Sequence, residues 1–256
     1  EDDNITHVDG EINSTRDAEV INLELIFADL ETLYKRKDRI EKKLRSGDKE
    51  LASEFRLIEN CLKTLESGDF INIANFSSKE DIKIIKSFQL LTAKPIFFIA
   101  NISEADSTQE NLIALKEYAK KMNQEVIEVQ IKLEEEIASL DEQDKKDFLE
   151  LEGIEEPALN KIIKKGYEIL GLDTFFTAGP NELRAWTLKR GSLAPQAAGR
   201  IHTDFERGFI KAEVICFEDY ISFGGEAGSK ENGKLRLEGK EYIFKDGDIA
   251  HFKFNV

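Results

Sequence analysis

The clearest hydrophobic pattern in the chain covers residues 17–66 and predicts two long amphipathic helices. Apolar residues recur there at alternating spacings of three and four, which places them on one face of a helix. The first stripe contains Leu23, Ile26, Leu30, Leu33, Ile40 and Leu44, with Lys37 interrupting it, and the second contains Leu51, Phe55, Ile58, Leu62 and Leu65. Because Gly47 supplies a turn between the stripes, we predict an antiparallel helical hairpin. Its charged outer face either faces water, as most such faces do, or forms an arm that contacts a large partner.

Residues 71–170 alternate between helical patterns and short apolar runs. Ser77 with Glu80 and Ser107 with Glu110 read as capping boxes, the first for a helix that runs to about Gln89. The second helix is expected to bury Leu112, Leu115, Tyr118, Ala119 and Met122. Strands are predicted at 95–100 and in "QEVIEVQ", and further helices at 132–140, 144–151 and 157–170. This alternation indicates parallel strands joined by right-handed crossovers, as in part of a doubly wound α/β domain.

The C-terminal segment has a different, mixed pattern. "DTFFTAG" and "ELRAWTLKRG" predict a hairpin of strands, and "IHTDFERGFIKAEVI" predicts an amphipathic helix. In that helix Ile201, Phe205, Phe209 and Ala212 would share one face, and Asp204, Arg207 and Lys211 another. "KLRLEGKEYIFKDGDIAHFKFNV" predicts closing strands with turns at Gly239 and at Asp246–Gly247. A small α+β unit fits this segment.

The charge of the chain is unevenly distributed and indicates a domain boundary near Gly171. The net charge is −15. Residues 1–170 carry 24 Lys and Arg against 38 Asp and Glu, and residues 171–256 carry 12 against 13. The acidic part should repel a phosphate backbone, whereas the nearly neutral part can present a local basic face.

Composition bounds the class of protein further. With 256 residues, of which 41% are hydrophobic, the chain can build two cores. Its two cysteines, Cys61 and Cys216, have no metal-ligand or redox spacing, which favours a reduced, cytoplasmic interior. The longest apolar run, 95–100, is far shorter than a membrane span. Because the chain opens on "EDDNITHVDG" without a Met, we expect a fragment of a longer protein.

The predicted strand 95–100 ends abruptly on polar side chains in "NISE", and this is the candidate binding site. In a parallel sheet, ligands bind beyond the carboxyl ends of the strands. Asn101 and Glu104 fall there, and 130–132 take the equivalent place on the next strand. An Asn amide offers a donor and an acceptor together, and a Glu carboxylate accepts only, so the pair suits the edge of a heterocycle with an amino group, such as a purine. The alternative is an ordinary polar strand end.

Two other motifs suggest chemistry but have simpler explanations. "GSKENGKL", 228–235, resembles a phosphate-binding P-loop, but Leu235 replaces the hydroxyl residue and a strand pattern follows, so we expect a surface loop. His202, Thr203 and Asp204 suggest a catalytic group, but three consecutive helical residues point in different directions. A capping or packing role is expected for them.

Several phrases of the sequence together resemble the YchF / Obg-like ATPase family over essentially the whole chain. They are "THVDG", "LLTAKP", "NISE", "GIEEPALNKIIKKGYEILGLDTFFTAGPNELRAWT", "APQAAGRIHTDFERGFIKAEVICFEDYI" and "YIFKDGDIAHFKFNV". The resemblance implies a P-loop G domain interrupted by a helical hairpin, followed by a TGS domain with a ubiquitin-like β-grasp fold. Residues 1–16 and 71–170 would then be the C-terminal part of the G domain, 17–70 the hairpin, and 171–256 the TGS domain.

The resemblance also implies an activity and its site. In this family N-x-x-E stands where GTPases have N-K-x-D, so Asn101 and Glu104 would flank the base and Ile102 would contact it, with Gln130 and Ile131 beside them. The intact protein would hydrolyse ATP, and also GTP, with Mg²⁺. The family's P-loop, switch regions and magnesium ligands have no counterpart in these 256 residues. We therefore expect the chain alone to be inactive, and its α/β part to expose apolar edges.

A ribosome or ribosomal RNA is the large partner that the resemblance implies. Contact residues would be Arg184, Lys189, Arg190, Arg200, Arg207 and Lys211. The alternative to an enzymatic switch is a non-enzymatic module for binding RNA or protein, formed by the hairpin and the TGS domain. A cytoplasmic monomer that binds neither DNA nor a membrane, and holds no metal of its own, is expected.

Overall fold

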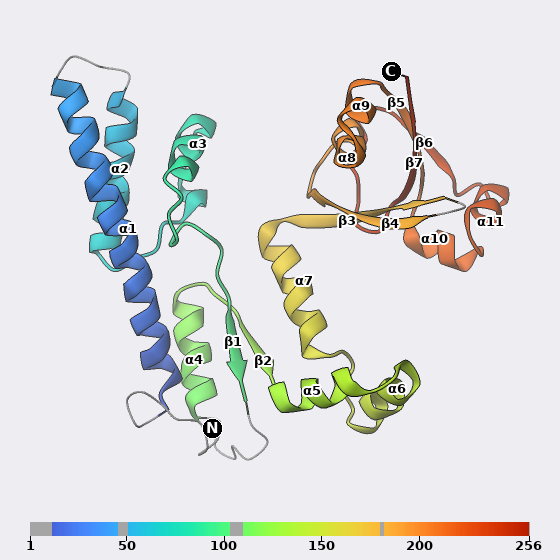
Figure 1. Cartoon of the computed structure of the whole chain (residues 1–256), viewed down its shortest axis with the longest axis horizontal. Coiled ribbons are helices and arrows are strands. Elements are labelled where there is room, and N and C mark those ends of the chain that lie inside the picture. The colour runs from blue at the N-terminus through green and yellow to red at the C-terminus, as the bar shows by residue number, and fades with distance from the viewer. Residues whose placement is uncertain (1–11, 46–50, 103–109, 180–181, 256) are drawn as a thin grey trace. The chain divides into compact units, whose positions relative to one another are not determined.

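The computed structural model describes residues 12–45, 51–102, 110–179 and 182–255 (Figure 1). These residues form two compact units, one ending at Lys161 and the other beginning at Ile162. The boundary falls inside helix α7 (Ala158–Leu170), about ten residues before the boundary expected near Gly171. None of the described helices has the length and apolar character that a membrane span requires.

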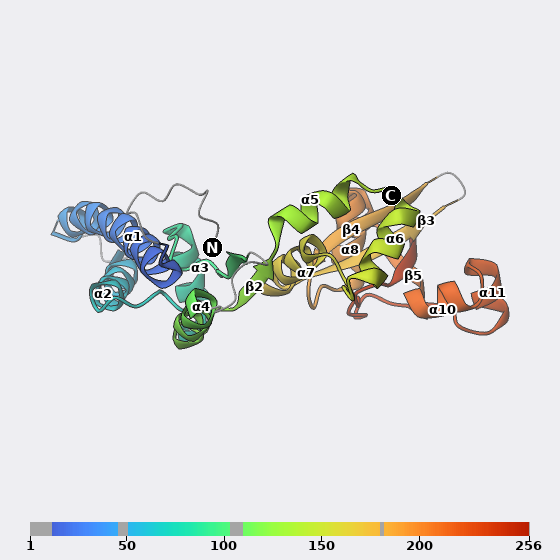
Figure 2. The same cartoon turned by 90° about the horizontal axis from the view of Figure 1, so that it is seen from below.

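The predicted hairpin is present as α1 (Ser14–Arg45) and α2 (Ala52–Glu66) (Figure 1). The two helices lie side by side in both views and run in opposite directions (Figure 1 and Figure 2). Side chains also pair across them, because Arg36 contacts Glu54 and Tyr34 contacts Glu66. The turn at Gly47 lies outside the described residues. The buried apolar residues of the two helices form one core, which contains Ile26, Leu33, Ile40, Leu57, Ile58, Cys61, Leu62 and Leu65.

The buried stripe of α1 differs from the predicted one toward the start of the helix. Leu23 was expected inside but is 48% exposed, while the polar side chains of Asn22 and Asp29 are buried. Asn22 Nδ2 donates to Tyr118 Oη at 2.8 Å and approaches Met122 Sδ at 3.2 Å. These partners belong to or directly follow α4 (Glu110–Lys121). The first half of α1 therefore packs on α4 as well as on α2.

A short 3₁₀ turn (Ile73–Asn75) and helix α3 (Lys79–Ser87) lead from the hairpin toward the sheet. The capping residue of α3 is Ser78, whose Oγ accepts from Asp81 N at 3.3 Å, and not Ser77 as expected. The prediction was one residue off because adjacent serines offer the same chemistry. The second expected box, at Ser107, lies outside the described residues.

The predicted parallel strands are confirmed as β1 (Phe98–Asn101) and β2 (Val126–Val129), connected through α4. Strand β1 begins at Phe98, whose N–H donates to Glu125 O. It does not begin at Pro95 as predicted, because proline has no N–H to donate. Ile99 is 51% exposed. Helices α5 (Ile131–Ser139), α6 (Glu142–Leu151) and α7 follow, close to their expected bounds.

The second unit is built on a mixed sheet in the order β4-β3-β7-β5-β6. Its strands are β3 (Leu172–Ala178), β4 (Leu183–Lys189), β5 (Phe209–Ile215), β6 (Arg236–Glu238) and β7 (Ile249–Phe254). β3 and β4 form the predicted antiparallel hairpin, and β3 runs parallel to β7. The alanines of helix α8 (Ala194–Ile201) belong to the same buried core as Phe175 and Val214. This arrangement is compatible with the β-grasp fold that a TGS domain would have.

The helix predicted over 201–215 is wrong. Helix α8 ends at Ile201, a five-residue helix α9 (Thr203–Arg207) follows, and β5 begins at Phe209. Gly208 explains the change, because its carbonyl accepts from Asn255 N at 2.9 Å and a Cβ there would lie 2.1 Å from Asn255 O. Only glycine permits this close approach, which starts the pairing of β5 with β7. Asp204, Arg207 and Lys211 consequently share no helical face.

The segment that resembles a P-loop is only partly a surface loop. Gly228 lies within α11 (Glu226–Glu231), which follows α10 (Phe217–Ser222), and a turn then leads through Lys234 to β6. A strand therefore follows Lys234, where a P-loop requires a helix N-terminus. The predicted turns near Gly239 and Gly247 are confirmed, since Tyr242 N donates to Gly239 O and Asp248 N to Lys245 O.

Candidate nucleotide-base site

The carboxyl ends of β1 and β2 bring the described candidate residues together. Asn101 is the last residue of β1, and Val129 ends β2 beside it. Ile102, the residue after β1, also lies beside the end of β2, because its N–H donates to Val129 O at 2.9 Å. Gln130 and Ile131 follow Val129 directly. Asn101, Ile102, Gln130 and Ile131 thus lie at the carboxyl ends of the two parallel strands, where ligands of such sheets commonly bind.

The Asn101 side chain is oriented by the start of α5. Its Oδ1 accepts from the backbone N–H of Ile131, with N and O 3.4 Å apart. Since the oxygen of the amide faces Ile131, the Nδ2 group is the donor that remains for a ligand. Asn101 is exposed, and so is Ile131, while Ile102 and Gln130 are half-buried.

The chemistry of this edge fits a flat heterocycle. Adenine and guanine both present N7 as an acceptor, so a donor such as Asn101 Nδ2 would suit either purine. Ile102 and Ile131 offer apolar contact to a ring. Glu104 would have to distinguish adenine from guanine, and it lies outside the described residues.

The six basic residues proposed for a large partner are not on one face. Alternation along β4 places Arg184 on the same side as α8, with its guanidinium 4.2 Å from the centre of the Trp186 ring. Lys189 and, on β5, Lys211 point to the other side. Arg190 pairs with Asp173 at 3.1 Å and Arg200 donates to Thr187 O at 2.8 Å. Arg207 lies at the end of α9.

His202 has the expected capping role. It precedes α9, and its Nδ1 accepts from Asp204 N at 3.2 Å while its ring contacts Phe205 edge-on. The described residues bring together no group of three or more His, Cys, Asp or Glu side chains that could hold a metal ion.

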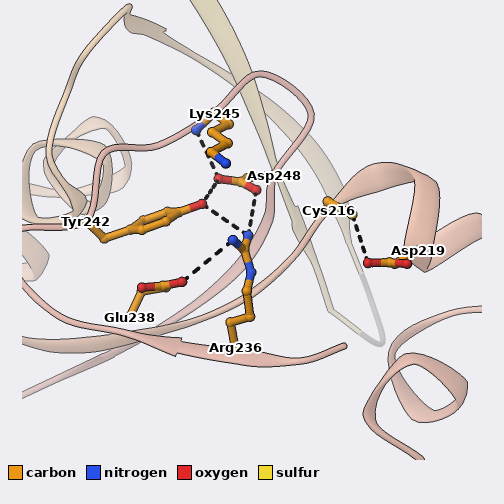
Figure 3. Close-up of polar contacts among 7 residues, drawn as sticks. All are labelled: Cys216, Asp219, Arg236, Glu238, Tyr242, Lys245 and Asp248. Atoms are coloured by element: carbon orange, nitrogen blue, oxygen red, sulfur yellow. Dashed lines mark hydrogen bonds and ion pairs between the residues drawn. The ribbon is translucent and has the colours of Figure 1, made fainter. Parts of the chain in front are cut away.

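A buried polar cluster in the second unit uses its polar groups internally (Figure 3). Asp248 Oδ2 accepts from Tyr242 Oη at 2.7 Å and from Lys245 N at 3.0 Å, and Oδ1 accepts from Arg236 at 3.2 Å. Nearby, the hydrogen bond of Cys216 to Asp219 raises the pKa of the thiol, which keeps it protonated. These contacts serve the fold and offer no reactive group.

Two residues that organise the first unit were missed by sequence reasoning. Asp29 and Glu134 each accept hydrogen bonds from backbone far along the chain. The available signal for Asp29 was its spacing, because it falls three after Ile26 and four before Leu33 on the buried face. Glu134 carries no such signal.

The fold defines a class of protein with a parallel α/β part, a helical hairpin and a separate mixed-sheet unit. The model of the family YchF-GTPase_C, described as a protein of unknown function (DUF933), matches residues 172–255. The "Ribosome-binding ATPase YchF" of Bacillus subtilis is 49% identical over all of this chain and 70% of its own length. The "Obg-like ATPase 1" of Gallus gallus is 40% identical, with 66% of its length covered. The chain belongs to the YchF / Obg-like ATPase family.

Solved structures agree with this assignment. The structure of the Schizosaccharomyces pombe YchF GTPase superposes with a TM-score of 0.84 at 32% identity, covering 99% of this chain and 69% of that one. A GTP binding protein from Pyrococcus horikoshii shares the fold at a TM-score of 0.57 and 19% identity. The sequence-based resemblance and the α/β fold class are therefore confirmed.

Proposed function

We propose that the protein binds ATP, and accepts GTP, through a base site formed by Asn101, Ile102, Glu104, Gln130 and Ile131. The observation that carries the proposal is the Asn101 amide, whose Oδ1 accepts from Ile131 N–H, so that Nδ2 remains as the donor for a ligand. Relatives named as ATPases support the choice of nucleotide. The intact protein acts as a nucleotide-hydrolysing switch.

Base selection follows from the hydrogen-bonding edges of the purines. Adenine carries an amino group at the position where guanine carries the O6 acceptor. The Asp of an N-K-x-D motif accepts from guanine N1–H and from the 2-amino group, and adenine has neither. The longer, displaced carboxylate of Glu104 removes that favoured guanine contact, so adenine is tolerated. Asn101 contributes to binding of either purine, and Glu104 shifts the preference toward ATP.

Hydrolysis needs groups that the described residues do not supply. They hold no acidic cluster for Mg²⁺, and the 256 residues contain no G-x-x-x-x-G-K-[ST] sequence. Phosphoryl transfer depends on such a loop and its metal. We therefore expect these 256 residues alone not to hydrolyse nucleotide. A parallel titration of ATP and GTP into the protein from the complete reading frame tests the proposal.

The second candidate function is ribosome association, which the names of several relatives favour. Arg184, Arg190 and Arg200 already hold Trp186, Asp173 and Thr187, so their substitution would disturb the fold. Lys189, Arg207 and Lys211 are the better test of an RNA contact.

Reversing Lys189, Arg207 and Lys211 to Glu should lower ribosome co-sedimentation by roughly tenfold and flatten its salt dependence, because each lost phosphate contact removes counterion release. The matched control reverses Lys230, Lys240 and Lys245, which changes the net charge equally. Equal sedimentation of the two triple variants would remove the proposed surface.

A further inference from the structure

We infer that Glu134 is a positioning residue that couples the candidate base site to the helix leading into the second unit. The inference rests on the proposed function, since it concerns the same Asn101 site. Both oxygens of the Glu134 carboxylate accept from the start of α7: Oε1 from Ala158 N at 2.6 Å and Oε2 from Leu159 N at 3.3 Å. The side chain of an earlier helix thus caps a later one.

The start of α7 depends on such an acceptor. The first N–H groups of a helix have no partner within it, and Pro157 before them has no N–H at all. Ala158 is buried, so water is a poor substitute. A carboxylate is also the side chain that the positive end of a helix favours most. Glu134 therefore fixes where α7 begins relative to α5.

The same turn of α5 holds the base-binding amide. Ile131 is the first residue of α5 and donates its N–H to Asn101 Oδ1, and Glu134 lies three residues later. One helical turn is short and stiff, with its ends about 5 Å apart along the axis. A shift of the start of α7 is thereby passed to the Ile131 N–H that orients Asn101.

The far end of α7 is held to the C-terminal sheet. Tyr167 Oη lies 3.1 Å from Thr187 Oγ1 of β4, and Gly171, at φ +60°, turns the chain directly into β3. Asn101, Ile131, Glu134 and α7 thus form a continuous series of contacts. Occupation of the base site and the attachment of α7 influence each other, and linkage makes the effect reciprocal.

The test compares two carboxylate caps in the complete protein. Glu134→Ala removes the cap of α7. Asp141→Ala removes the cap of α6, where Asp141 Oδ1 accepts from Gln143 N and Asp144 N, both at 3.0 Å. Glu134→Gln retains one oxygen acceptor, so it still tests the inference if Glu134→Ala fails to fold. Titration of a fluorescent ATP analogue gives Kd, and thermal unfolding gives Tm.

Both alanine variants should lower Tm similarly, but only Glu134→Ala should weaken ATP binding, by about five- to tenfold, with Glu134→Gln between it and the wild type. Hydrogen exchange at Ala158 and Leu159 should slow when ATP binds the wild type and not when it binds Glu134→Ala. Equal Kd values for Glu134→Ala and Asp141→Ala would overturn the inference. Absence of ATP binding by the wild type would instead overturn the proposed function, and the inference with it.

Discussion

Replacing Asp29 with alanine is expected to destabilise the first unit by roughly 3 kcal/mol. Asp29 is 3% exposed and lies in the middle of α1. Its Oδ1 accepts from Leu91 N at 2.9 Å, and its Oδ2 accepts from Thr92 N and Thr92 Oγ1, both at 2.7 Å. Alanine would leave these donors, two of which belong to the buried Thr92, without an acceptor. The loop that leads to β1 would lose its attachment to the hairpin.

Cys61 provides a local readout of this change. Burial, and secondarily the charge of Asp29, raises the pKa of its thiol to about 11, so the folded protein keeps it protonated and shielded. In a Cys216→Ser background of the 256-residue chain, Asp29→Ala should speed thiol labelling and lower the denaturant midpoint. Glu31→Ala, an exposed carboxylate on the same helix, is the control and should change neither. Slow labelling of Asp29→Ala, equal to the control, would contradict the prediction.

Replacing Asp248 with alanine should destabilise the second unit by about 3 kcal/mol or more. Asp248 is 1% exposed and accepts from Tyr242, Lys245 N and Arg236 (Figure 3). Its loss would leave a half-buried guanidinium and a phenol without their acceptor. Trp186 is the only tryptophan of the 256 residues and lies against Phe175 in this core, so its fluorescence reports unfolding of the unit.

The Asp248 cluster also predicts a dependence of stability on alkaline pH. Burial, followed by the hydrogen bond to Asp248, raises the pKa of Tyr242 from about 10 to about 12. The folded state therefore favours the neutral phenol, and this stabilisation is complete below pH 10 and is lost as the pH rises through 12. Tyr242→Phe should remove this part of the pH dependence. Glu241→Ala, an exposed neighbour, should keep both the stability and its pH profile, and identical profiles for Tyr242→Phe and the wild type would refute the assignment.

The sequence predicted the elements whose signals are local. The hairpin follows from a three-and-four spacing over 17–66, and the parallel strands follow from their alternation with helices. The place of Asn101 in the fold was predicted because a polar residue that ends an apolar strand falls at the carboxyl edge of a parallel sheet. Each of these inferences uses residues close together in the chain.

What the sequence did not predict depends on partners far along the chain. The sequence of strand β5 has a helical pattern, and the strand forms because Gly208 approaches Asn255, 47 residues later in the chain. The burial of Asp29 is explained only once its hydrogen bond with Thr92 is known. Glu134 looks like any helical glutamate without Ala158 beside it. The hydropathy pattern also failed to predict that Asn22 is buried. A polar residue is expected at the surface unless its hydrogen-bond partner, here Tyr118 of α4, is known.

The central claim is that Asn101 recognises a purine base through Nδ2, and one titration tests it most directly. Fluorescent ATP and GTP analogues are titrated into the complete protein, its Asn101→Asp variant, and the 256-residue chain. Asn101→Asp keeps an acceptor for Ile131 N–H but replaces the Nδ2 donor with an oxygen of a charged carboxylate, which only accepts. We predict tighter binding of ATP than of GTP by the wild type, a loss of about tenfold or more for both in the variant, and no binding by the chain alone. Undiminished ATP binding by Asn101→Asp would contradict the claim.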